Sequence, residues 1–192
     1  ALSPNAEGFV TYLEISDNLT PTDGGKVYSA QLDARGLPGR LATRLGYHYS
    51  DYGIFHVSQF DASLRQSLQW QGFGIGLGAG LRYIDLKRQA NPRYIARARD
   101  NYLVPHVTLS LGRLGYYARL GYTGRRAFDV RDGGRCVSNG ALEIEHSTQL
   151  ALGRTWKTLD LQLQFGRQQA TELMTARPVR IDQYAVRLNY RF

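Results

Sequence analysis

The strongest constraint on the fold is an alternation of apolar and polar side chains with a period of two, clearest over residues 181–192. In this stretch every second side chain is apolar or aromatic, namely those of Tyr184, Val186, Leu188, Tyr190 and Phe192. Polar or small residues occupy the positions between them. Because successive side chains of a strand point to opposite faces, this pattern predicts a β-strand with one face in an apolar medium and one in a polar medium.

The same alternation recurs along the whole chain in segments of about ten residues, the length with which a tilted strand crosses a hydrocarbon layer. Counting the last stretch, we predict ten strands, at residues 7–16, 27–36, 41–50, 60–70, 73–83, 101–111, 114–123, 141–152, 156–167 and 181–192.

The predicted connections alternate strictly between long and short. Tight turns are expected at residues 37–40, 71–72, 112–113 and 153–154, and long loops include residues 85–100 and 124–140. Short turns on one side and long loops on the other are typical of a transmembrane β-barrel.

Aromatic side chains predicted to face outward gather at the two ends of the strands, as expected for two membrane–water interfaces. At the long-loop end these are Tyr28, Tyr49, Phe60, Tyr83, Tyr122, Phe165 and Tyr184. At the short-turn end they are Phe9, Trp70, Phe73, Tyr116, Tyr190 and Phe192.

We therefore predict a single all-β domain over residues 1–192: an antiparallel up-and-down transmembrane β-barrel of about ten strands, with long extracellular loops and short periplasmic turns. An edge strand of a soluble β-sandwich would also show the terminal alternation, but it would explain neither the loop asymmetry nor the two aromatic belts.

The end of the chain resembles the last strand of bacterial outer-membrane β-barrels, which ends in Phe with an aromatic residue two positions earlier. Phe192, Tyr190, Leu188, Val186 and Tyr184 match that pattern. The resemblance implies a location in the bacterial outer membrane, with the outer-membrane lipid as surroundings. It also implies that this strand is the signal that the barrel-assembly machinery reads.

Composition narrows the alternatives. A net charge of +8 fits a phosphate-bearing lipid, a polyanion or a nucleic acid. We expect no nucleic-acid binding, because the basic residues lie in loops beside the predicted membrane and no nucleic-acid module is recognisable. The single cysteine, Cys136, excludes an intrachain disulfide within these residues. The His and Cys spacing predicts no metal site, and we expect no cofactor.

The predicted inward positions, which include Glu14, carry charges of both signs. Charges in a narrow lumen must pair or meet water, and we predict cross-strand pairs between Asp33 and Arg44 and between Asp160 and Arg191. The predicted lumen-lining residues are Asp33, Arg44, Asp61, Arg65, Gly74, Gly76, Gly78, Gly80, Arg82, His106, Tyr117, Arg119, Glu143, Glu145, Asp160, Arg187 and Arg191.

Four of these, Gly74, Gly76, Gly78 and Gly80, alternate along one strand and place no side chains in the lumen. They leave a groove that arginines and tyrosines fill or that forms a water path, which would favour small anionic or hydroxylated solutes. Alternatively, the glycines let the strand bend at a corner of the barrel.

An enzymatic alternative rests on His48 and Ser50, which resemble the His-x-Ser pair of outer-membrane lipid A deacylases. In those enzymes the pair faces the membrane and attacks an acyl ester with the help of a carboxylate. Here the alternation places both residues inside the barrel, so they form only a weak catalytic candidate.

Basic residues of the long loops would lie at the outer surface, where lipopolysaccharide presents phosphates that arginine binds well. The candidates for this contact are Lys87, Arg88, Arg93, Arg97, Arg99, Arg125 and Arg126. A solvated loop face is the alternative.

Three functions remain open from the sequence. The first is a narrow channel for small polar or anionic solutes. The second is a plugged barrel that serves as an envelope anchor, an adhesin or a component that binds an envelope protein. The third is a lipid A-directed hydrolase.

Overall fold

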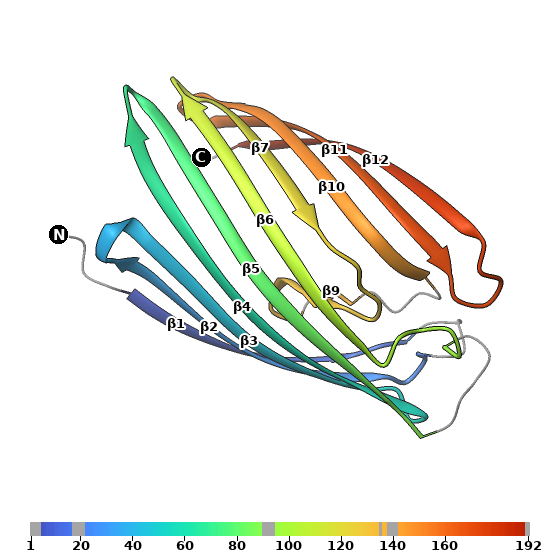
Figure 1. Cartoon of the computed structure of the whole chain (residues 1–192). Coiled ribbons are helices and arrows are strands. Elements are labelled where there is room, and N and C mark those ends of the chain that lie inside the picture. The colour runs from blue at the N-terminus through green and yellow to red at the C-terminus, as the bar shows by residue number, and fades with distance from the viewer. Residues whose placement is uncertain (1–4, 17–21, 90–94, 135, 138–141, 191–192) are drawn as a thin grey trace.

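A single antiparallel β-sheet makes up most of the molecule, as the computed structural model shows for residues 5–16, 22–89, 95–134, 136–137 and 142–190 (Figure 1). Ten strands follow one another in chain order, each hydrogen-bonded to the next. They are β1 Asn5–Glu14, β2 Lys26–Leu37, β3 Leu41–Asp51, β4 Phe55–Trp70, β5 Phe73–Arg88, β6 Asn101–Arg113, β7 Tyr116–Thr123, β10 Leu142–Thr155, β11 Leu159–Glu172 and β12 Pro178–Tyr190. The up-and-down order and the ten strands of this sheet were predicted correctly.

The sheet is not closed, which corrects the prediction of a barrel. In the described chain β1 pairs only with β2, and β12 pairs only with β11. The strands instead bend into a trough with two walls, and both termini lie at the end where the short turns are (Figure 1).

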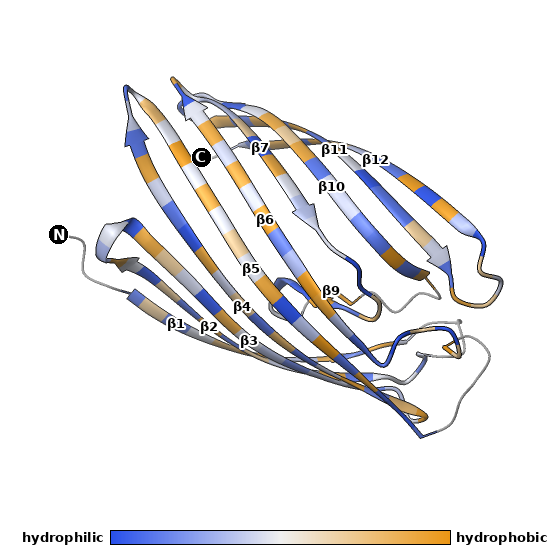
Figure 2. Ribbon diagram, in the orientation of Figure 1, coloured by the Kyte–Doolittle hydropathy of each residue, from blue (hydrophilic) through white to orange (hydrophobic). Residues whose placement is uncertain are grey.

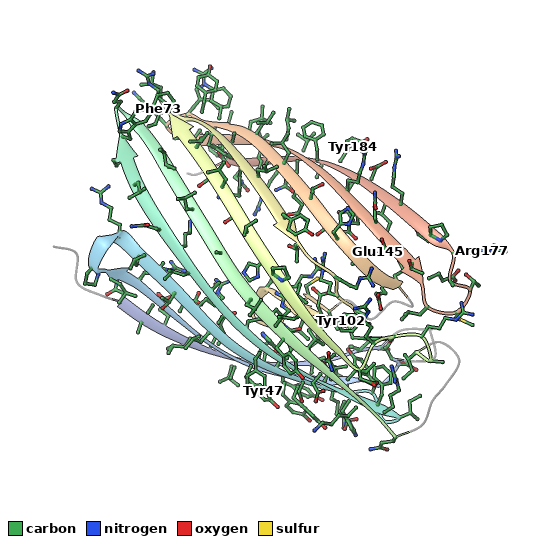
Figure 3. All side chains as sticks on the ribbon, in the orientation of Figure 1. Tyr47, Phe73, Tyr102, Glu145, Arg177 and Tyr184 are labelled. Atoms are coloured by element: carbon green, nitrogen blue, oxygen red, sulfur yellow. The ribbon has the colours of Figure 1, made fainter. Side chains whose placement is uncertain are left out.

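Alternating hydropathy runs along the strands and is visible as orange and blue bands in Figure 2. Tyr47 and Tyr184 lie on the outer sides of the two walls, whereas Tyr102 lies between the walls (Figure 3). The outer face is strongly apolar and exposed, with Leu103 and Leu188 each 63% exposed. The predicted outward phase is therefore confirmed for most strands.

Strand β1 has the opposite phase to the one predicted. Phe9 pairs with Gln31 and Thr11 pairs with Ser29, and both partners belong to the inner face of β2. Glu14 pairs with Lys26 on the outer phase, so it does not line the interior. Both phases of this strand contain apolar residues, so alternation alone could not distinguish its faces.

The tight turns are set by residues with positive φ. Gln71 and Gly72 have φ of 47° and 79° and form the predicted two-residue hairpin turn. The next turn is at Leu114 and Gly115, two residues later than predicted, because β6 continues to Arg113. The predicted turn at 153–154 was also wrong, since β10 extends to Thr155. A short 3-10 helix, η1 (Pro38–Arg40), connects β2 to β3.

A hydrophobic core lies at the long-loop end and was not predicted. The strands β4 and β5 run five residues further toward this end than expected, from Phe55 and to Arg88. Apolar side chains there also occupy the inner face. The core comprises Tyr52, Phe55, Val57, Ile84, Leu86, Ile95, Ala98, Tyr102, Val104, Ala127, Phe128 and Leu173.

Candidate functional site

The long loop after β7 folds inward and fills the long-loop end of the trough. We call residues 126–134 and 136–137 the plug segment. It contains the short strands β8 (Val130–Arg131) and β9 (Cys136–Val137), which pair with each other, and the 3-10 turn η2 (Asp132–Gly134). A Cβ added at Gly133 would lie 3.6 Å from Gln31 Oε1, so the turn lies against the inner face of β2.

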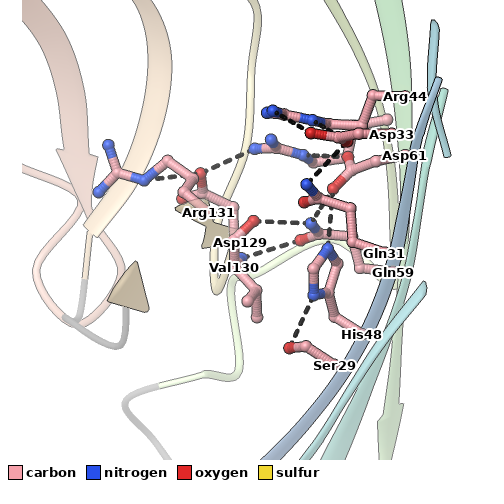
Figure 4. Close-up of polar contacts among 11 residues, drawn as sticks. Ser29, Gln31, Asp33, Arg44, His48, Gln59, Asp61, Asp129, Val130 and Arg131 are labelled. Atoms are coloured by element: carbon pink, nitrogen blue, oxygen red, sulfur yellow. Dashed lines mark hydrogen bonds and ion pairs between the residues drawn. The ribbon is translucent and has the colours of Figure 1, made fainter. Parts of the chain in front are cut away.

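Electrostatic contacts fix the plug segment to the wall formed by β4 and β5 (Figure 4). Arg82 Nε donates to Asp61 Oδ1 at 2.6 Å, and its NH1 nitrogen donates to Asp129 Oδ2 at 3.0 Å. Asp129 is completely buried, and Arg126 and Arg131 each place Nε 3.4 Å from its Oδ2 oxygen. One buried carboxylate thus contacts three guanidinium groups, of which that of Arg82 also pairs with Asp61.

A pair of amide hydrogen bonds adds a second link to the same wall. Gln59 Nε2 donates to the Val130 carbonyl oxygen at 2.7 Å, and the Val130 N–H donates to Gln59 Oε1 at 2.9 Å. Gln59 is fully buried, so its side chain satisfies the edge of β8 in the way a neighbouring strand would. Phe128 anchors the same segment in the hydrophobic core, 5.1 Å from the Phe55 ring.

Arg126 is held inside the plug segment and is not at the outer surface, which corrects its grouping with the lipopolysaccharide candidates. It is 3% exposed and donates to the Gly124 carbonyl and to Ser147 Oγ, both at 3.0 Å. Burial lowers the pKa of the Arg126 guanidinium from its ordinary value, and Asp129 opposes that shift.

His48 does not contact Ser50 as the deacylase resemblance required. Its Nδ1 lies 2.8 Å from Ser29 Oγ and its Nε2 lies 3.1 Å from Asp61 Oδ2. Serine, histidine and carboxylate are the groups that acyl-transfer enzymes use. Here, however, Ser29 is 4% exposed and lies against Gly134, and Asp61 also binds Arg82. The contact links β2, β3 and β4 and lies on the inner face of the trough.

The predicted pair of Asp33 and Arg44 is confirmed. Arg44 donates from Nε at 2.8 Å and from NH2 at 3.0 Å to the two oxygens of Asp33. The other predicted pair cannot be assessed, since Arg191 and Phe192 lie outside the described residues. Asp160 instead accepts hydrogen bonds from Thr155 Oγ1 at 2.7 Å and from Tyr117 at 3.3 Å.

The glycines of β5 do not leave an open groove. A Cβ on Gly76 would collide with Ser110, one on Gly78 with Thr108, and one on Gly80 with His106. These three side chains come from the paired strand β6 and lie over the glycines. Of these four glycines only Gly74 could accept a Cβ without a clash, since the nearest neighbour, Gln69 Nε2, lies 3.8 Å from the ideal Cβ position.

Three inward arginines, Arg65, Arg119 and Arg187, have no ion pair among the described residues. They lie toward the short-turn end, beyond the plug segment, on β4, β7 and β12. The inner face of that half is therefore positively charged, although Asp160 lies there too.

Glu143 and Glu145 lie near the long loops, where β10 has a β-bulge. Glu143 accepts a hydrogen bond from the Tyr102 hydroxyl at 2.8 Å, and Glu145 accepts one from Thr171 at 2.9 Å. The pairing of β10 with β11 shifts register between Ile144 and His146, which places the bulge at Glu145.

Among the other loop residues, Arg97 is exposed and Arg99 is 59% exposed. Arg125 lies 3.3 Å from Glu143, Arg88 binds Asp100 at 2.5 Å, and Lys87 lies 3.9 Å from Asp85. Arg93 lies outside the described residues.

The residues that hold the plug segment, chiefly Gln59, Phe128, Asp129 and Val130, were missed by the sequence analysis. One signal was available: in Phe55–His56–Val57 and Ile84–Asp85–Leu86 the apolar residues occupy the inward phase of strands that otherwise carry polar residues there. Apolar side chains facing inward require something apolar inside.

Other classes of site are not evident in the described part of the chain. No group of three or more His, Cys, Asp or Glu residues there could hold a metal ion. No helix within the same ranges is long and apolar enough to cross a membrane. Comparison with protein-family models and with curated proteins gives no match.

Proposed function

We propose that this chain is a bacterial outer-membrane β-barrel whose outer mouth is closed by the plug segment, and that it serves as an envelope anchor or partner-binding component. The observation that carries this proposal is the buried link of Asp129 to Arg82, Arg126 and Arg131, reinforced by Gln59. A passage for solutes does not require a carboxylate buried among three arginines, whereas a permanent plug does require such fixed contacts.

The outer face supports the membrane location. Exposed apolar residues cover it from end to end, and Tyr184, Val186, Leu188 and Tyr190 present the aromatic and apolar pattern of the terminal strand with exposures of 58% or more. A soluble protein rarely exposes an apolar face of this extent. The proposal includes recognition of this strand by the barrel-assembly machinery.

Membrane insertion requires the two free edges to be paired. An unpaired backbone group in hydrocarbon costs several kcal/mol, so β1 and β12 cannot both face lipid as open edges. The even number of strands makes these edges antiparallel, which allows them to pair with each other. We therefore include closure between β1 and β12 in the proposal.

Lipopolysaccharide is the proposed surface ligand of the long-loop end. Arg97 and Arg99 are exposed and Arg125 is 39% exposed, so their guanidinium groups can reach phosphates in the outer leaflet. Arg126 is excluded from this role because it is buried.

The test is single-channel conductance of the purified full chain in planar bilayers. We expect the wild type to be silent, and we expect a variant carrying Asp129→Asn and Gln59→Ala to conduct because both links of the plug segment to β4 and β5 are lost. Asp132→Asn is the matched control, since Asp132 is an exposed carboxylate in the same segment. Steady conductance of the wild type with anion preference would contradict the plugged barrel and support the narrow channel.

A further inference from the structure

On the inner face of the wall opposite β1 to β4, small residues alternate with long polar residues, most of them glutamines. Along one row of paired residues, Thr108, Gly121, Gln149, Gly166 and Gln183 are neighbours on β6, β7, β10, β11 and β12. The next row toward the short turns contains Ser110, Arg119, Ala151, Gln164 and Ala185. Each long polar side chain therefore stands beside a glycine, an alanine or another small residue.

These rows line a cavity of about 190 Å³ that is open to solvent, with Thr108, Arg119, Gln149, Gln162, Gln164 and Gln183 among its lining residues. Of these six residues Gln162 is buried and the other five are exposed. The glycines here have looser surroundings than Gly76, Gly78 and Gly80 of β5. A Cβ added at Gly166 would lie 3.5 Å from Gln183 Oε1, and one at Gly121 would lie 3.9 Å from Thr108 Cγ2.

Gln162 directs a free donor into this cavity. Its residue is 8% exposed, and its Oε1 accepts a hydrogen bond from Gln164 Nε2 at 3.0 Å. With the two amides in this orientation, the Gln162 Nε2 group is the donor that is left over. Within the described chain this nitrogen forms no hydrogen bond and stays accessible, so it can donate to a bound molecule.

The polar groups that line the cavity indicate which class of ligand it can bind. Arg119 supplies a guanidinium without an ion pair, and no carboxylate lines the cavity. Guanidinium groups bind oxyanions strongly through two parallel donors. Each glutamine offers a donor and an acceptor, which matches hydroxyl groups that both donate and accept.

We propose that this cavity is a binding site for a small hydroxylated anion of the sugar-acid type, entered from the short-turn end. Arg119 holds the carboxylate, and the glutamines, led by Gln162, hold the hydroxyl groups. The plug segment contacts this wall at Ile144 and Ser147, but none of its residues lines the cavity, so the site goes beyond the proposed anchoring function and can be tested separately from it.

The experiment is isothermal titration of the full chain in detergent with three probes: glucuronate, glucose and acetate. Glucuronate carries both features, glucose lacks the anion, and acetate lacks the hydroxyl groups. We expect saturable glucuronate binding, with glucose and acetate each at least about tenfold weaker, the effect of losing one charge-assisted contact or a set of hydrogen bonds.

Two variants assign the contacts. Arg119→Gln should weaken glucuronate binding about tenfold and leave glucose binding unchanged, because it removes only the charge. Gln162→Leu should weaken the binding of both sugars. The matched control is Arg113→Gln, since Arg113 stacks over Phe73 at the short turn and lies outside the cavity. Folding of each variant is verified by circular dichroism before titration.

Three results would overturn the proposal: no saturation by glucuronate in the millimolar range, acetate binding as tightly as glucuronate, or an Arg119→Gln variant that matches the wild type. None of them bears on the plug, whose conductance test is independent. An Asp129→Asn variant should bind glucuronate like the wild type.

Discussion

Asp129 is central to the ion pairs of the plug segment, because its buried carboxylate lies next to the guanidinium groups of three arginines. Removing one member of a buried ionic group leaves the others uncompensated, which costs more than the ion pairs themselves contribute. We expect Asp129→Asn to lower the free energy of unfolding by about 3–5 kcal/mol. Urea unfolding of the folded protein in lipid vesicles measures this, with Asp132→Asn expected to behave like the wild type.

Two buried serines on neighbouring strands give a matched comparison. Ser29 Oγ contacts His48, whereas Ser50 Oγ is buried without a hydrogen-bond partner in the described structure. Ser29→Ala should therefore cost about 1 kcal/mol, and Ser50→Ala should change stability by less than about 0.5 kcal/mol in either direction. Equal losses for the two substitutions would show that the His48 contact is not as described.

At the scale of the element, three glycines of β5 leave space that side chains of the paired strand β6 occupy. Gly78 has no room for a Cβ because Thr108 Oγ1 occupies that position. We expect Gly78→Ala to cost about 1–3 kcal/mol from overpacking, and Thr108→Ala in the same chain to recover most of that loss. Gly74→Ala is the control, since a Cβ there meets nothing closer than 3.8 Å. Additive losses in the double variant would argue against direct contact.

At the scale of the whole molecule, the proposed membrane location requires the open sheet to be completed by pairing of its two free edges. If β1 and β12 pair, outward-facing residues of the two strands come within disulfide distance. We expect Leu188→Cys to form a disulfide within the chain when it is combined with Val10→Cys or with Tyr12→Cys. The two double variants test two neighbouring registers. Cys136→Ser removes the native thiol, the single cysteine of the chain.

The measurement is the mobility of the oxidised, membrane-assembled protein on a denaturing gel, compared with each single-cysteine variant. Cross-linked dimers in place of the internal disulfide would contradict self-closure and indicate that a second copy completes the sheet.

The sequence by itself determined the ten strands, the meander order and most of the two-sided character of the sheet, because an alternation with period two is a local property of the chain. It also determined the pairing of Asp33 with Arg44, since adjacent antiparallel strands fix that register. The local pattern could not assign the faces of the strand around Phe9, where both phases contain apolar residues. It also could not position the turn within residues 112–115, where several residues are compatible with a turn.

Only the tertiary structure decided what fills the interior. Gln59 and Val130 are 71 positions apart, and no local pattern shows that a loop returns to satisfy a glutamine on a distant strand. In the sequence, nothing distinguishes Asp129 from other loop carboxylates, and only the fold places Arg82, Arg126 and Arg131 around it. The same is true of the amide-lined cavity, whose glutamines lie on three strands and meet only because those strands pair. Local periodicity specifies the face of the sheet on which a side chain lies, whereas tertiary packing specifies the residues that it contacts.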